Sequence, residues 1–97
     1  MAIAVYFHPK GLTLQQFGEV HARLVAAGKG EIPQRLHHSC FGEDGDLMVY
    51  EIWDSPESFA AFGETLMPIL ADVGVDPGDP AVMPLHRVDQ STVRPES

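Results

Sequence analysis

The sequence is poor in cysteine and in basic residues. Cys40 is the one cysteine among 97 residues, which excludes an internal disulfide framework and a cysteine-rich zinc site and leaves the cytoplasm as the expected compartment. Six Lys and Arg stand against 14 Asp and Glu, and the formal net charge is -8. Such a charge repels phosphate backbones and anionic lipid surfaces, so we expect neither nucleic acid nor a membrane as a partner.

Long apolar runs and phosphate-binding loops are also missing. No stretch approaches the roughly 18 consecutive apolar residues that a membrane helix needs, and Gly28-Lys29-Gly30 is too short for a nucleotide-binding loop. The apolar first residues lack a basic n-region and a cleavage pattern, so we interpret them as a strand. His37 and His38 are adjacent on an expected strand and point to opposite faces, so we predict no metal site.

What is present is an ordinary globular composition, with 44% hydrophobic and 21% charged residues. Thr13 and Gln16 have the spacing of a capping box, and Gly28 ends the helix that follows. Ser55 and Pro56 are typical of the start of a second helix. Segments rich in β-branched and aromatic residues predict strands, and the polar stretch 42–45 predicts a hairpin loop. The expected strands are 2–8, 35–41, 47–53 and 82–88.

The order βαββαβ predicts an α+β, ferredoxin-like domain over residues 1–88, followed by a polar tail at 89–97. Its four-stranded antiparallel sheet has the order 4-1-3-2, with both helices on one face. Pro84 inside the last strand indicates an edge position.

Both faces of this sheet are largely apolar, because the residues of the first and third strands are apolar in both alternating sets. Two helices cover only one face. An uncovered apolar face of several hundred Å² is more than soluble monomers usually expose, so we expect a homodimer that packs sheet on sheet. The alternative is a monomer whose C-terminal tail lies over the open face.

Several motifs resemble those of the dimeric α/β-barrel superfamily, and within it the antibiotic-biosynthesis-monooxygenase-like branch with its small uncharacterised bacterial members. The resemblance spans residues 1–88. It is carried by Gly11-Leu12-Thr13, Val49-Tyr50-Glu51-Ile52-Trp53-Asp54-Ser55, Glu57-Ser58-Phe59-Ala60-Ala61-Phe62, Leu66-Met67-Pro68 and Pro84-Leu85-His86.

The resemblance implies a dimeric α/β barrel with a pocket between helices and sheet, but several reaction classes share this fold. Haem-degrading members carry a Trp on the second helix and a His further along, where this chain has Phe62 and Asp72. This departure counts against haem degradation, and no cofactor is expected.

A candidate acid/base pair comes from the predicted hairpin. If Phe41 pairs with Asp46, then His38 lies across from Val49 and diagonal to Glu51, at ~7–8 Å between Cα atoms. A carboxylate beside this imidazole favours its charged form, with a pKa near neutrality, suited to taking a proton from a phenol or enol. The alternative is a structural polar pair.

The candidate substrate pocket contains Tyr6, Trp53, Phe62 and His86, and the aromatic members could equally serve as core residues. Cys40 is expected to be a small buried hydrophobe. We therefore expect a homodimer that binds a small apolar or aromatic ligand, such as a cofactor-independent monooxygenase or isomerase acting on an aromatic or polyketide-like substrate. The alternative is a non-enzymatic ligand-binding or assembly module.

Overall fold

The computed structural model describes residues 1–89, so nearly all of the predicted tail at 89–97 lies outside the described residues. The predicted βαββαβ order is confirmed. The elements are β1 (Ile3–Phe7), α1 (Leu14–Ala26), β2 (Arg35–Glu43), β3 (Asp46–Trp53), α2 (Pro56–Val73) and β4 (Ala81–Pro84).

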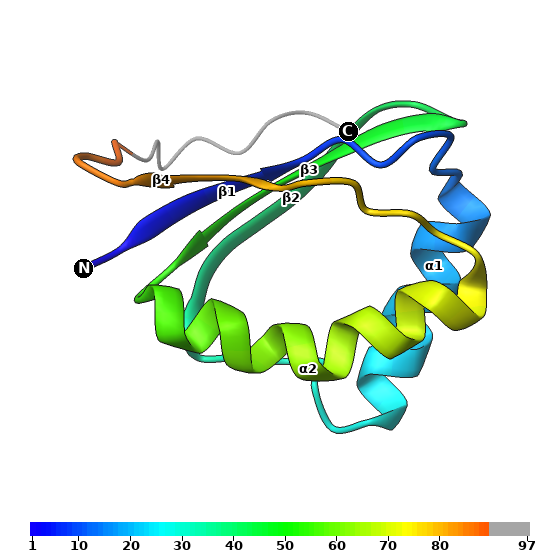
Figure 1. Cartoon of the computed structure of the whole chain (residues 1–97), viewed down its shortest axis with the longest axis horizontal. Coiled ribbons are helices and arrows are strands. Elements are labelled where there is room, and N and C mark those ends of the chain that lie inside the picture. Colours follow the sequence, from blue (N-terminus) through cyan, green and yellow to red (C-terminus); the bar gives the residue numbers. More distant parts are fainter. Residues whose placement is uncertain (90–97) are drawn as a thin grey trace.

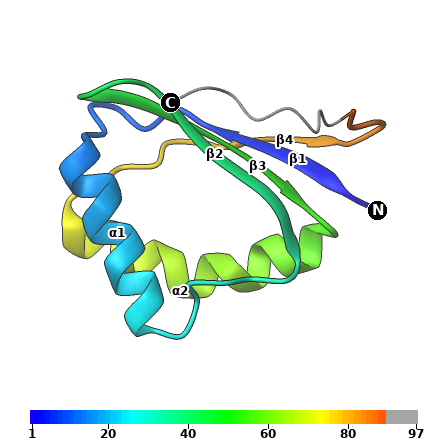
Figure 2. The same cartoon turned by 180° about the vertical axis from the view of Figure 1, so that it is seen from behind.

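The strands form one antiparallel sheet with the order β2-β3-β1-β4, which is the predicted order. Both helices lie on the same side of this sheet (Figures 1 and 2). The ferredoxin-like α+β prediction is therefore confirmed. Among the described residues, no helix combines the length and apolarity needed to cross a membrane.

Both helices begin where the sequence predicts. The Thr13 side chain accepts a hydrogen bond from the Gln16 backbone N–H, and the Gln16 side chain accepts one from the Thr13 backbone N–H, which completes a capping box. Asp44 from the hairpin loop also accepts a hydrogen bond from the Leu14 N–H at 2.9 Å. Ser55 caps α2 through the Ser58 N–H at 3.1 Å. The hairpin loop and the start of α1 are thus tied together.

The hairpin differs from its prediction in loop length. The strands extend to Glu43 and Asp46, which pair with each other, so the loop is the two-residue Asp44-Gly45 rather than the polar stretch 42–45. A φ of 89° at Gly45 permits this tight reversal. The expected register was therefore wrong by two residues: His38 lies directly across from Glu51. A shift of two leaves every side chain on its predicted face.

The edge strand β4 ends earlier than predicted, at Pro84 rather than at residue 88. Its position beside β1 at the edge of the sheet agrees with the prediction from Pro84. The Leu85 N–H still donates to the Ala2 carbonyl at 3.0 Å, and the chain then leaves the sheet.

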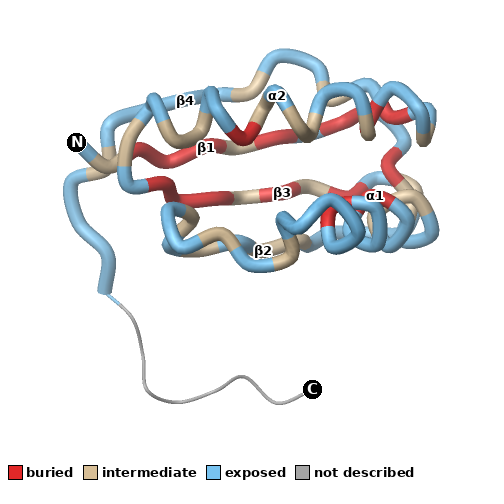
Figure 3. Tube along the Cα trace, turned by 90° about the horizontal axis from the view of Figure 1, so that it is seen from below, coloured by how far each residue is buried: buried red, intermediate tan, exposed pale blue. Residues whose placement is uncertain are grey.

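The core lies between the sheet and the two helices. Val5 and Trp53 are fully buried there, and Figure 3 shows the buried stretches following the central strands β1 and β3. The helix-facing set of β3 alternates with the set on the other face, as expected for a strand covered on one side. The buried cluster consists of Ile3, Val5, Phe7, Leu12, Val20, Leu24, Leu47, Val49, Trp53, Phe62, Leu70 and Val75.

The opposite face of the sheet has no helix over it. Ala4 and Ile52 near its centre are buried, but Phe41 on β2 and Met83 on β4 are 44% and 50% exposed. The predicted alternative, in which the C-terminal tail covers this face, concerns residues outside the described part of the chain.

Candidate functional site

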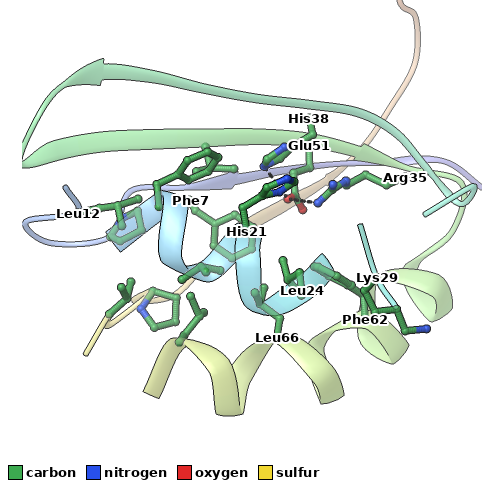
Figure 4. A pocket seen from close by; sticks show the side chains of 17 residues that line it. Phe7, Leu12, His21, Leu24, Lys29, Arg35, His38, Glu51, Phe62 and Leu66 are labelled. Carbon is green, nitrogen blue, oxygen red and sulfur yellow. Dashed lines mark hydrogen bonds and ion pairs between the residues drawn. The ribbon is translucent and has the colours of Figure 1, made fainter. Parts of the chain in front are cut away.

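A cavity of about 80 Å³ lies between the helices and the helix-facing side of the sheet (Figure 4). Since one water needs roughly 10–15 Å³ of such space, the cavity has room for more than isolated waters. Most of its wall is apolar, and a few polar side chains gather on one side, as in small-molecule sites. The lining residues are Phe7, Pro9, Leu12, Phe17, Val20, His21, Leu24, Lys29, Arg35, His38, Val49, Glu51, Phe62, Leu66, Leu70, Val75 and Pro77.

Glu51 is the buried polar residue at the centre of this group. It is 3% exposed, and its Oε1 accepts a hydrogen bond from the Trp53 indole Nε1 at 2.9 Å. Its Oε2 lies 3.5 Å from the Arg35 guanidinium and 3.5 Å from His38 Nε2. Burial raises the pKa of Glu51, while the hydrogen bond from Trp53 and the charge of Arg35 oppose this rise.

His38 faces Glu51 from the neighbouring strand. Its side chain is 28% exposed, and its ring stacks on Phe17 at 5.9 Å between centroids. Burial lowers the pKa of His38 to about 4, and the positive charges of Arg35, His21 and His37 act in the same direction.

The expectation that Glu51 favours the charged imidazolium and keeps the pKa of His38 near neutrality was therefore wrong. The main reason is the burial of the ring, which disfavours its charged form, and the positive charge of nearby Arg35 lowers the pKa further. At neutral pH His38 is consequently a neutral imidazole, which can accept a proton.

Arg35 was not among the predicted site residues, because strict alternation from His38 places it on the open face with His37. The register shifts between Arg35 and His37, and this bulge turns Arg35 toward the helices, across from Trp53. Its guanidinium also lies 5.6 Å from the Phe62 ring centroid. Alternation alone carries no signal of such a bulge.

His21 and Lys29 were also missed as site residues. His21 lies on the sheet-facing side of α1 between Phe17 and Leu24, so its helical spacing was a usable signal. Lys29 follows the end of α1, in a loop without periodicity, and only the folded chain shows that it reaches the cavity.

The structure brings together three of the six predicted site residues. His38, Glu51 and Phe62 line the cavity. Trp53 lies behind Glu51, fully buried, and lines a second hollow instead.

Two predicted pocket residues lie elsewhere. Tyr6 pairs across the sheet with Tyr50 on the open face, because its neighbours Val5 and Phe7 are the helix-facing residues of β1. His86 follows the end of β4 and is exposed. Neither lines the cavity, so their predicted role in this pocket is corrected.

Cys40 occupies an intermediate position at the border of the core, next to β3. Burial raises the pKa of its thiol. Its protonated, unreactive form is consistent with the packing role expected of it.

Comparison with known proteins identifies the fold. No protein-family model and no curated protein matches the sequence, but several solved structures do. A candidate antibiotic biosynthesis monooxygenase from Caulobacter crescentus is 23% identical over 91% of each chain, with a TM-score of 0.62. A counterpart from Chloroflexus aurantiacus has a TM-score of 0.61. The Chloroflexus protein is 14% identical, over 92% of this chain and 98% of that one.

A third similar structure is SnoaB from Streptomyces nogalater, described as a cofactor-independent oxygenase. It is 16% identical, over 90% of this chain and 93% of that one, with a TM-score of 0.57. At such identities the likeness establishes the fold rather than the reaction. The chain has the α+β fold of the antibiotic biosynthesis monooxygenase-like proteins, as the motifs predicted.

Proposed function

We propose that this chain is a cofactor-independent oxygenase that binds a small aromatic or polyketide-like phenol or enol in the helix–sheet cavity. The observation that carries the proposal is the pair of Glu51 and His38, with Oε2 and Nε2 3.5 Å apart, in the wall of a mainly apolar cavity. Apolar walls favour the binding of an aromatic ring system, and a neutral imidazole can accept the proton of an acidic hydroxyl group. The description of SnoaB as a cofactor-independent oxygenase supports the same reaction class.

In the proposed reaction, His38 takes the proton of the bound phenol or enol, while Glu51 orients the ring through Nε2 and leaves Nδ1 as the acceptor. The developing negative charge on the substrate raises the pKa of the imidazole, so its basicity increases as the proton moves. Glu51 and His38 are thus assigned the roles of orienting group and base.

The resulting anion is electron-rich and reduces dioxygen, the second substrate. For an anthrone, oxygen adds to the methylene carbon to form a hydroperoxide, from which water is then lost. The carbon loses both hydrogens and keeps one oxygen atom as a carbonyl, and the other oxygen leaves as water. Anthrone and O₂ give anthraquinone and water, which balances without a further reductant.

The test measures oxygen uptake with anthrone as the probe, using the purified parent protein and the variants His38→Gln and Glu51→Gln. We expect a loss of about 100-fold or more in the His38→Gln variant, in the usual range for removal of a general base. The matched control is His86→Gln, since His86 is exposed outside the cavity. Equal rates in the parent and the His38→Gln variant would show that this residue is not the base.

A second function, ligand binding without turnover, is favoured by the low pKa of His38. A group with a pKa of about 4 is a weak base, although it can still hydrogen-bond a ligand. Binding of anthrone under anaerobic conditions, with no oxygen consumed when air is admitted, would identify this second function.

We further propose that the protein works as a cytoplasmic homodimer joined through the open sheet face. Support comes from the missing helix layer on that face and from the exposed side chains of Phe41 and Met83 at its two edges. Packing two such faces together removes apolar surface from water. Light scattering should give twice the 10.6 kDa chain mass at micromolar concentration, and the mass of one chain would contradict the proposal.

A further inference from the structure

We propose that the ligand carries a carboxylate, which binds beside Lys29 in a second hollow adjoining the cavity. This inference rests on the proposed function, because it assumes that the cavity holds the apolar part of the same ligand. It assigns the substrate class more closely: an aromatic acid rather than a neutral aromatic compound.

Basic side chains concentrate at this site although the chain has few of them. The whole sequence has 6 Lys and Arg against 14 Asp and Glu, yet the cavity is lined by Lys29 and Arg35 and by a single carboxylate, that of Glu51. Arg35 is already paired with Glu51. Among residues 1–89, no carboxylate oxygen lies within 4.0 Å of the Lys29 ammonium group. Lys29 is therefore the cation left for a ligand.

The second hollow, of about 210 Å³, offers hydrogen-bond donors. It is lined by Lys29, Ile32, Gln34, Trp53, Ser58, Ala61 and Phe62, and no Asp or Glu is among them. The Ser58 hydroxyl oxygen accepts a hydrogen bond from the Ser55 hydroxyl group at 3.0 Å, so the O–H of Ser58 can itself donate to a ligand. An ammonium, an amide and a hydroxyl group together suit a carboxylate.

The two hollows adjoin, because both are lined by Lys29 and Phe62. Figure 4 shows these two side chains near one another at one end of the cavity, with Leu12 at the other end. A ligand with its ring among the apolar residues could therefore extend past Phe62 and place its carboxylate near Lys29. The indole of Trp53, which lines the second hollow, would then lie close to the ligand.

A purely structural role for Lys29 is the alternative. It follows the last turn of α1, and its backbone N–H donates to the Leu24 carbonyl at 2.8 Å. An ammonium group near a helix C-terminus stabilises the helix. That role would not distinguish a charged ligand from a neutral one of the same shape, so the two readings are separable by experiment.

The test compares phenylbutyrate with phenylbutyramide, which have nearly the same shape but differ in charge. Binding to the dimeric parent protein is measured by calorimetry and by the fluorescence of Trp53, the one tryptophan of the chain. We expect the carboxylate to bind about tenfold more tightly than the amide, a typical worth of one partly exposed charged hydrogen bond.

The variant Lys29→Gln should remove this preference, and Lys29→Glu should reverse it. The matched control is Lys10→Gln, because Lys10 is the other lysine, is exposed and lines neither hollow. A preference that survives in Lys29→Gln, or an amide that binds the parent as tightly as the carboxylate, would overturn the inference and leave the cavity proposal standing. If neither compound binds the parent, the inference is wrong, and the anthrone assay decides the cavity proposal separately.

Discussion

Truncation of Glu51 should measure how much the stability of the fold depends on this one carboxylate. In Glu51→Ala, the buried Trp53 N–H loses its acceptor at 2.9 Å, which costs about 1–3 kcal/mol. Arg35, whose side chain is 14% exposed, also loses its partner. Since breaking a buried ion pair from one side costs roughly 3–5 kcal/mol and this pair is long at 3.5 Å, we expect a total loss of about 3 kcal/mol in the free energy of unfolding.

Glu51→Gln separates the hydrogen bond from the charge. Its amide oxygen can still accept from the Trp53 indole, so we expect a loss of at most about 1 kcal/mol. Urea denaturation followed by Trp53 fluorescence, at one fixed protein concentration, measures both variants. The control is Glu64→Ala on the exposed side of α2, expected within about 0.5 kcal/mol of the parent. Equal stability of the alanine and glutamine variants would refute the assigned role of the carboxylate.

Three further outcomes are expected. The pKa of His38 is lowered from 6.5 to about 4. Between these two pH values the imidazole is therefore protonated in the unfolded chain but neutral in the folded chain. The free energy of unfolding should thus fall by about 2 kcal/mol as pH drops through this window, after a discount for partial exposure. Gly42→Ala should destabilise more than Gly45→Ala in urea titrations, since both have positive φ but only at Gly42 would the new Cβ lie 2.8 Å from Met48 and 3.0 Å from a backbone oxygen. Lysine at both Phe41 and Met83 should give a folded monomer in light scattering.

Each of these outcomes has its own check. The raised pKa of Glu51 acts in the opposite sense above pH 4.5, so the His38 effect is the difference between the parent and His38→Gln, and no difference at any pH would contradict it. An equal loss in the free energy of unfolding for Gly42→Ala and Gly45→Ala would mean that the atoms around Gly42 move aside for the new Cβ without strain. A dimer that persists with both lysines would rule out the open face as the interface.

Local sequence signals were sufficient for the framework of the fold. Capping at Thr13 and Ser55 located both helix starts, because these signals act over three or four residues. Pro84 indicated an edge strand for a similarly local reason, the missing backbone N–H. The faces of β3 were also predictable, since alternation depends only on the pleat of a strand.

The site required more than local signals. A loop two residues shorter than expected moved His38 from a diagonal position to one directly opposite Glu51, and a bulge moved Arg35 to their side of the sheet. These two shifts placed a guanidinium beside the carboxylate. Burial of the His38 ring, together with the charge of this guanidinium, lowers the pKa of His38 to about 4, where a value near neutrality was expected.

The sequence by itself determined the order of elements, the sheet topology and the helix-facing position of His38 and Glu51, because periodicity and capping are properties of neighbouring residues. Only the tertiary structure decided the register, the bulge, the pairing of Arg35 with Glu51 and the approach of Lys29 to the cavity. Those features depend on which distant groups share a space from which water is largely excluded, and burial and charge there set the pKa of each group.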